Sequence, residues 1–228
     1  MATQVEGIKR ISFAAGIVNV DGFCFCSKDV QHYVLTHFHG DHTIGLSSRF
    51  HWGTLYCTPE TAALARANLR VSDKYLREVP LHQPITILGD VQMTFISANH
   101  CPGSAVVVFE ELSTGRVVVH TGDFRAAQCV VDDVLKTLAG RRVALLYLDT
   151  TYCSPRWDFP DQPVACRAIA DLVRAELAAE GRPLVVVGAF QIGKERAAAA
   201  AAEAAGSPVW VEPGRWATLQ RCGWAQRK

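Results

Sequence analysis

The chain has 228 residues, of which 49% are apolar, and this is enough for one well-packed domain and part of a second. Its 23 Lys and Arg residues nearly balance its 22 Asp and Glu residues. The resulting formal charge of +1 excludes a general electrostatic attraction to nucleic acid or to an anionic membrane. Any polyanion must therefore be held by a local site.

The eight cysteines include no CxxC pair, and a chain of this size does not need disulfides for stability. We expect reduced thiols in an intracellular protein. The first ten residues, MATQVEGIKR, lack the apolar centre of a signal peptide. No apolar run approaches the roughly 18 residues that a membrane span needs. The sequence therefore predicts a soluble protein with no membrane partner.

The first part of the chain is predicted to be rich in strands. Short apolar runs with many β-branched residues favour strands over helices, and their nearly continuous apolarity predicts sheets covered on both faces. In chain order, these runs are residues 17–20, 33–35, 93–97, 105–109, 117–120 and 143–148. One helix is expected between them, because Thr58, Pro59 and Glu60 are typical of a helix start that continues to about Asn68.

The last part of the chain has a different pattern. Prolines and acids at residues 154–163 interrupt the periodicity, so we expect a second unit to begin there. An amphipathic helix is predicted over residues 163–180. Its apolar stripe consists of Ile169, Leu172, Val173 and Leu177. Residues 184–188 predict a further strand, and the alanine-rich residues 194–205 predict a helix that ends at Gly206.

The most chemically specific stretch is HFHGDH, which follows the predicted strand at residues 33–35. Extended backbone sends alternate residues to the same side, so His37 and His39 can face one metal ion. A turn at Gly40 would bring Asp41 and His42 to a neighbouring ion. Any single His is more often an ordinary surface or core residue, and Asp41 alone could cap a helix. Three His and one Asp within six positions favour a metal centre for zinc, manganese or iron.

Two later strand ends supply further candidate ligands. His100 lies in NHCPG after the strand at residues 93–97, and Asp123 lies in TGDFR after the strand at residues 117–120. Polar residues beside glycines at strand ends are where sheet proteins assemble sites. The remaining histidines match no ligand motif, and we expect them to be ordinary surface or core residues: His32, His51, His82 and His120.

In this order, HxHxDH, NHCPG and HTGDFR resemble the metallo-β-lactamase superfamily. NHCPGS, LYLDTTYCSP and IGKE are similar to its β-CASP branch, specifically to the DNA cross-link repair exonucleases that include Apollo and Artemis. The resemblance extends from about Val20 to Trp224. It implies an α/β fold, an incomplete αββα sandwich in which residues 1–153 form the N-terminal metallo-β-lactamase segment. Residues 154–228 would then begin a β-CASP insertion domain.

The resemblance also implies two metal sites. The first would use His37, His39, His100 and Asp123. The second would use Asp41, His42 and a bridging Asp123. One or two Zn²⁺ ions are implied, with Mg²⁺ or Mn²⁺ as alternatives at the second site. Asp21 in NVDGF and Asp149 in LDTTY match acidic motifs of the family, and they are implied to orient the ligands from behind. The implied catalytic set is Asp21, Asp41, His42, Asp123 and Asp149.

A phosphate pocket is implied at IGKE, where a loop enters a helix N-terminus that suits an anion. Gly193 and Lys194 are its implied contacts, and Thr36 is expected to assist. Without the resemblance, an ordinary helix start with a solvated lysine is equally expected. Gln191 departs from the family pattern, which usually has Ser at that position.

The function implied is a metal-dependent 5′-to-3′ DNA exonuclease that acts in the nucleus in interstrand cross-link repair. It would hydrolyse phosphodiesters from 5′-phosphorylated DNA ends with a metal-activated water. One alternative is a truncated, non-catalytic zinc-binding paralogue that keeps only the first ion. Another is a small-molecule metallo-hydrolase of the thioesterase or lactonase kind, which shares HxHxDH. Relatives continue beyond the region matching Trp224 and supply another His, so we expect the second site to be incomplete in this chain.

Overall fold

The computed structural model describes residues 2–179 and 183–224, which form two compact units. The first unit contains the chain up to Asp149 and from Gln220 onward, and the second is Thr150–Leu219. The predicted division into residues 1–153 and 154–228 stays a prediction. Its boundary lies four residues after the boundary between the compact units, which falls between Asp149 and Thr150. Within the described ranges, no helix is long and apolar enough to cross a membrane.

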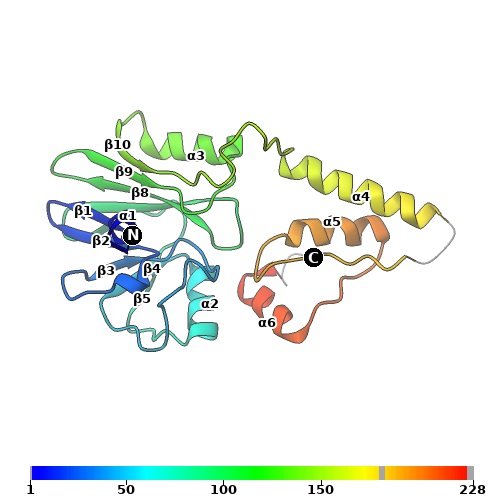
Figure 1. Ribbon diagram of the computed structural model, residues 1–228, viewed down its shortest axis with the longest axis horizontal. Helices are drawn as coiled ribbons and strands as arrows, with labels where there is room; N and C mark the ends of the chain where they lie inside the picture. Colours follow the sequence, from blue (N-terminus) through cyan, green and yellow to red (C-terminus); the bar gives the residue numbers. More distant parts are fainter. Residues whose placement is uncertain (1, 180–182, 225–228) are drawn as a thin grey trace. The chain divides into compact units, whose positions relative to one another are not determined.

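Two five-stranded sheets form the first unit (Figure 1). The first sheet has the order β1-β2-β3-β4-β5. Its strands are β1 (Arg10–Phe13), β2 (Gly16–Val20), β3 (His32–Val34), β4 (Thr54–Cys57) and β5 (Leu76–Glu78). The second sheet has the order β10-β9-β8-β7-β6. Its strands are β6 (Ile85–Ile87), β7 (Val91–Ser97), β8 (Ala105–Glu111), β9 (Arg116–His120) and β10 (Val143–Tyr147).

Both sheets are mixed. In the first sheet β1 and β2 are antiparallel, whereas β2 to β5 pair in parallel. In the second sheet β6 to β9 form an antiparallel meander, and β10 pairs in parallel with β9. Because β7 and β9 are both antiparallel to β8, they run in the same direction, and their carboxyl ends meet at one edge of the sheet.

The helices lie outside the sheets or in the second unit. They are α1 (Ala2–Lys9), the short 3₁₀ helix η1 (Phe23–Phe25), α2 (Pro59–Leu69), α3 (Gln128–Leu138), α4 (Gln162–Ala178), α5 (Glu195–Ala205) and α6 (Pro213–Arg221). Helix α2 begins as predicted, with Thr58 as its N-cap, and it packs beside β5. Helix α3 packs on β7 and β8, whereas α4 packs on α5.

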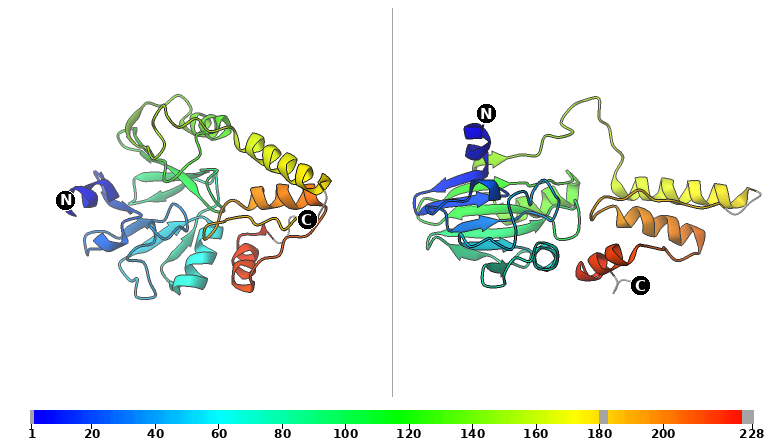
Figure 2. Two further views of the ribbon diagram at one scale, coloured as in Figure 1. Left: turned by 45° about the vertical axis from the view of Figure 1, so that its right-hand side comes forward. Right: turned by 60° about the horizontal axis from the view of Figure 1, so that its bottom comes forward.

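The main core lies between the two sheets, which form adjacent layers in the left view of Figure 2. Strand β8 explains the layering, because alternate side chains of a strand point to opposite faces. Val107 and Phe109 enter the core between the sheets, whereas Val106 and Val108 face a second core that α3 covers. The continuous apolar sequence of β8 therefore reflects burial on both faces, as predicted, and the α/β sandwich is confirmed.

One prediction about the second unit is wrong. Residues 184–188 form no strand, and Leu184 and Val186 are 88% and 80% exposed. The described part of this unit contains no neighbouring strand to accept their backbone hydrogen bonds. Helix α4 ends at Ala178, and the predicted end at residue 180 lies outside the described residues.

The predicted apolar stripe of α4 is also only partly buried. Val173 is buried together with Ala170, which was not predicted, whereas Leu172 is 67% exposed. Leu177 is exposed as well. Helix α5 packs against α4, and a single helix covers only a narrow strip of its neighbour.

Replacing Phe109 with alanine tests the core between the sheets. Phe109 is fully buried and its ring lies 5.8 Å from that of Phe13. We expect Phe109→Ala to lower the free energy of unfolding by about 3–5 kcal/mol, because it removes buried apolar surface and leaves a cavity. Denaturant unfolding gives the value, with Leu135→Ala on the exposed face of α3 as the control. Equal stability of the two variants would contradict the core assignment.

Candidate metal centre

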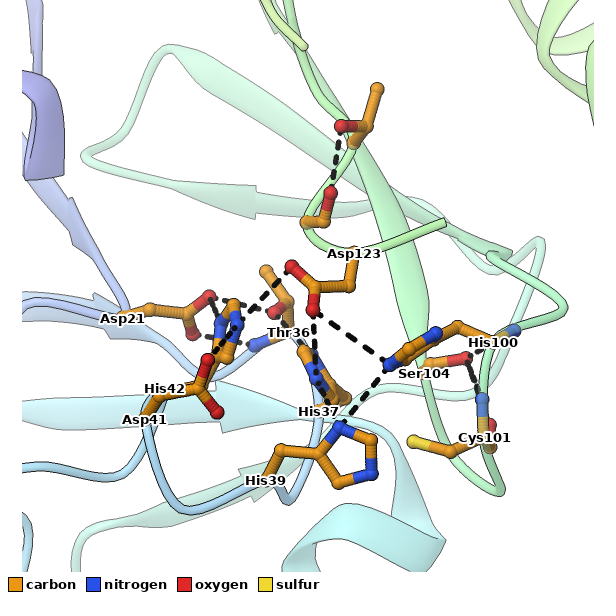
Figure 3. A network of polar contacts seen from close by, with 12 residues as sticks. Asp21, Thr36, His37, His39, Asp41, His42, His100, Cys101, Ser104 and Asp123 are labelled. Atoms are coloured by element: carbon orange, nitrogen blue, oxygen red, sulfur yellow. Dashed lines mark hydrogen bonds and ion pairs between the residues drawn. The ribbon is translucent and has the colours of Figure 1, made fainter. Parts of the chain in front are cut away.

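Three loops at strand ends bring the predicted metal ligands into one cluster (Figure 3). His37, His39, Asp41 and His42 follow β3, and His100 and Asp123 follow β7 and β9 respectively. The backbone N–H of Ala105, the first residue of β8, donates to the carbonyl of Thr36 at 3.0 Å. This bond joins the histidine loop of the first sheet to the second sheet.

The loop that carries His100 is held by hydroxyl groups. Ser104 Oγ accepts hydrogen bonds from the backbone N–H of His100 at 3.2 Å and of Cys101 at 3.1 Å. Thr58 and Thr61, at the start of α2, donate to the carbonyl of Gly103 at 2.7 and 3.0 Å. The position of His100 is therefore set by α2 as well as by β7.

Four pairs of ligand atoms among the predicted first-site residues have separations that suit a metal site. His39 Nδ1 lies 3.0 Å from His37 Nε2 and 3.2 Å from His100 Nε2. Asp123 Oδ2 lies 3.8 Å from His37 Nε2 and 3.7 Å from His100 Nε2. Zinc bonds of about 2.0–2.2 Å in a tetrahedron place neighbouring ligand atoms about 3.3–3.6 Å apart. The predicted first ligand set fits a divalent metal ion.

The other carboxylate oxygen of Asp123 faces a second group of ligands. Asp123 Oδ1 lies 3.2 Å from His42 Nε2, and Asp41 Oδ2 lies 3.6 Å from the same nitrogen. Asp123 therefore directs one oxygen to each of the two predicted sites, as a bridging carboxylate does. Carboxylate oxygen and imidazole nitrogen suit a second divalent ion at this position.

Asp21 lies behind the ligands, at the end of β2, and is 5% exposed. Its carboxylate accepts hydrogen bonds from the backbone N–H of Thr36 at 2.9 Å, from Thr36 Oγ1 at 2.7 Å and from His42 Nδ1 at 2.8 Å. Burial raises the pKa of Asp21, but the hydrogen bond and charge of His42 outweigh burial and leave the pKa below its usual value. The contact turns Nε2 of His42 toward Asp123, which suits the orienting role predicted for Asp21.

Without a bound cation, the histidines carry very different charges. Burial lowers the pKa of His42, but hydrogen bonds to Asp123 and Asp21 outweigh it and raise the pKa to about 10. Burial, followed by the charge of His42, lowers the pKa of His37 to about 3. The hydrogen bond from His42 lowers the pKa of Asp123 to about 2. The imidazolium of His42 thus neutralises part of the carboxylate charge at neutral pH. It lies where a metal ion would otherwise balance that charge.

Two of the three predicted phosphate contacts have hydrogen-bond partners within the protein, and their phosphate-binding role stays a prediction. Thr36 is 1% exposed and its hydroxyl donates to Asp21. The backbone N–H of Gly193 donates to Glu195 Oε1 at 2.9 Å, and that carboxylate also pairs with Arg215 at 3.0 Å. Lys194 is exposed at the start of α5, in the second unit with Gly193.

Asp149 lies beside the cluster rather than within the two ligand groups. Its backbone N–H donates to Thr121 Oγ1 at 2.9 Å, two residues before Asp123. Burial lowers the pKa of His100, and the negative charge of Asp149 acts in the opposite direction. Asp149 is therefore close enough to influence a ligand electrostatically, which fits its predicted supporting position.

Sequence reasoning missed two residues near the ligands. The Cys101 sulfur lies within 4.8 Å of ligand nitrogens of His37, His39 and His100, and the only sequence signal was its place beside His100. His120 was expected to be an ordinary histidine. Its Nδ1 accepts from the backbone N–H of Gly122 at 3.0 Å, so it shapes the turn that leads to Asp123.

Comparisons with known proteins agree with this architecture. Residues 27–209 match the family described as Beta-lactamase superfamily domain. The chain is 39% identical over 206 residues to DNA cross-link repair protein SNM1 of Arabidopsis thaliana, covering 90% of this chain and 42% of that protein. It is 36% identical over 184 residues to 5′ exonuclease Apollo of Gallus gallus, covering 80% of this chain and 38% of that protein. The chain thus spans less than half the length of either relative.

A crystal structure of a protein of unknown function from Enterococcus faecalis V583 has a similar fold. Its TM-score is 0.56 at 19% sequence identity, and the match covers 85% of this chain and 49% of that chain.

The role of Asp21 can be tested without disturbing the backbone. Asp21 has a φ of 49°, a conformation that asparagine also tolerates. We expect Asp21→Asn to weaken zinc binding by about 10- to 100-fold, because His42 loses the acceptor that orients it. Competition with a chromophoric chelator measures the affinity. Asp29→Asn, at an exposed carboxylate, is the matched control, and equal affinities for the two variants would contradict the orienting role.

Proton release on metal binding tests the charge of His42. A metal ligand must be deprotonated, and His42 has a pKa of about 10 whereas His37 is already neutral at pH 7. We therefore expect about one proton to leave when His42 binds the ion, and affinity to rise up to about tenfold per pH unit below that pKa. Calorimetry in buffers of different ionisation enthalpy counts the proton. His42→Ala should abolish the release, and a wild-type protein that releases none would refute the assignment.

Proposed function

Since the chain belongs to the beta-lactamase superfamily and is similar to DNA cross-link repair proteins over most of its length, we propose that it is a β-CASP nuclease, a metal-dependent 5′-to-3′ DNA exonuclease. The proposed substrate is a DNA end that carries a 5′-phosphate, and the proposed process is interstrand cross-link repair. The proposed location is the nucleus, and this rests on the similarity to DNA repair proteins alone. The name of the relative 5′ exonuclease Apollo supports the direction of attack.

The observation that carries this proposal is the position of Asp123 between two ligand groups. Its Oδ2 faces the nitrogens of His37 and His100, and its Oδ1 faces His42. Hydrolysis of a phosphodiester requires stabilisation of both the attacking and the leaving oxygen, and two divalent ions held by one bridging carboxylate are suited to this task. We propose zinc at the first site because three imidazoles and one carboxylate oxygen suit it. Zinc, Mg²⁺ or Mn²⁺ is proposed at the second site.

The contacts of the side chains support a proposed role for each residue of the site. A bound divalent ion supplies Lewis-acid chemistry that makes water nucleophilic at neutral pH and stabilises charge growing on phosphate oxygens. Asp123 and Asp41 contribute negative charge that holds the cations, and Asp21 orients His42 from behind. No side chain is needed as the nucleophile. Lys194, which is exposed at the start of α5, is the proposed contact for the 5′-phosphate.

A nuclease assay with the purified chain tests this function. The substrates are single-stranded DNA oligonucleotides, labelled at the 3′ end and carrying either a 5′-phosphate or a 5′-hydroxyl. We expect shortening from the 5′ end with zinc, and faster cleavage of the phosphorylated strand. Asp123→Asn keeps the size of the side chain but removes the charge that joins the sites, so we expect activity to fall at least about 100-fold. Lys194→Gln should reduce the preference for the 5′-phosphate.

Two outcomes would contradict the proposal. Zinc binding without any cleavage beyond the level of Asp123→Asn would indicate a non-catalytic metal protein. Hydrolysis of thioester or lactone substrates with DNA left intact would indicate a small-molecule hydrolase.

A further inference from the structure

The hydroxyl group of Thr36 connects the Asp21 carboxylate to a ring of the metal cluster. Thr36 Oγ1 lies 2.7 Å from Asp21 Oδ2 on one side and 3.0 Å from His37 Nδ1 on the other. All three side chains are buried, with Thr36 1% exposed and His37 fully buried. The three groups form a chain of contacts that water does not interrupt.

The hydrogen atoms of this chain can be assigned by counting donors. Asp21 also accepts from the backbone N–H of Thr36 and from His42 Nδ1, so its carboxylate faces donors on both oxygens. A hydroxyl has one hydrogen and two lone pairs. Since the Asp21 oxygen can only accept, the hydroxyl of Thr36 donates to it. The lone pair of Thr36 Oγ1 must then accept a hydrogen bond from N–H at Nδ1 of His37.

We infer that Thr36 is a positioning residue that keeps the hydrogen of His37 on Nδ1 and thereby presents the lone pair of Nε2 to the metal. This inference rests on the proposed function only in assuming that a metal occupies the cluster. It gives the Asp21 carboxylate a role at both predicted sites. Asp21 orients His42 of the second site directly, and it orients His37 of the first site through Thr36.

Geometry at the other ring nitrogen agrees with this assignment. His37 Nε2 points into the cluster, 3.0 Å from His39 Nδ1 and 3.8 Å from Asp123 Oδ2 (Figure 3). A hydrogen on Nε2 would occupy the space between these ligand atoms and would exclude a cation. A hydrogen on Nδ1 leaves that space open. The choice of tautomer at one buried ring therefore decides whether the first site can be completed.

Nitrogen NMR of the histidine rings tests this inference before any metal is added. Long-range proton–nitrogen correlation at pH 7 distinguishes the two tautomers, and the His37 signals are assigned by their loss in His37→Gln. We expect the wild-type protein to show hydrogen on Nδ1 of His37. Hydrogen on Nε2 instead would overturn the inference, and this outcome does not depend on the folding of any variant.

Three variants extend the test to metal binding. Thr36→Val has nearly the same shape without the hydroxyl, and we expect it to shift His37 toward the Nε2 tautomer and to weaken zinc binding by about 10- to 100-fold. Thr36→Ser keeps the hydroxyl and should restore both properties. Thr114→Val loses a hydroxyl that donates to Glu111 Oε2 in the turn between β8 and β9, away from the ligands, and it should leave the His37 tautomer unchanged.

The outcomes separate positioning from a purely structural role. Folding of each variant is checked by its thermal unfolding midpoint. A folded Thr36→Val protein with an unchanged tautomer and unchanged zinc affinity would refute the inference. Loss of affinity without a change of tautomer would also refute it, because it would show a structural effect alone. None of these readouts uses DNA cleavage, so an inactive wild-type chain would defeat the proposed function and leave this inference standing.

Discussion

The buried carboxylate of Asp21 is the constraint on which the metal centre depends. Removing a charged carboxylate from water costs several kcal/mol unless its oxygens are fully hydrogen-bonded. Every donor that satisfies Asp21 comes from the segment containing the predicted ligands, namely the backbone and hydroxyl of Thr36 and the ring of His42. The same bonds that offset the burial of Asp21 therefore fix the conformation of residues 36–42. Metal-ligand geometry and folding are thus coupled through one side chain.

The two sheets supply the remaining geometry. Parallel pairing of β2 with β3 places Asp21 and the histidine loop at the same edge of the first sheet. Because β7 and β9 run in the same direction, His100 and Asp123 also emerge at one edge of the second sheet. The hydrogen bond from Ala105 to the carbonyl of Thr36 brings the two edges together. The ligands come from three loops that belong to different sheets. Packing of one sheet against the other brings these loops together.

Charge explains why a cation would be needed before the proposed nucleic-acid substrate could bind at this cluster. Asp123 and the buried Asp21 carry negative charge at neutral pH, and the imidazolium of His42 offsets part of it. A phosphodiester is itself an anion and would be repelled by this arrangement. Divalent cations held between the carboxylates would reverse the local sign of the charge. The same carboxylates that would repel the proposed substrate from the metal-free cluster would thus allow it to approach once cations are bound.

The sequence by itself determined the ligand types and the layered α/β architecture. Tightly spaced histidines in HFHGDH and polar residues at the ends of apolar runs are local sequence patterns. They identify the ligands because few side-chain types bind metal ions. Short elements escaped prediction, such as β5 and β6, because three-residue strands are stabilised by neighbours distant in the sequence. Residues 184–188 show the converse, since their apolar pattern lacks a neighbouring strand in the described part of the second unit. Only the tertiary structure decided the hydrogen-bond partners of Thr36 and Gly193, because partners such as Asp21 are brought close by folding and not by position in the chain.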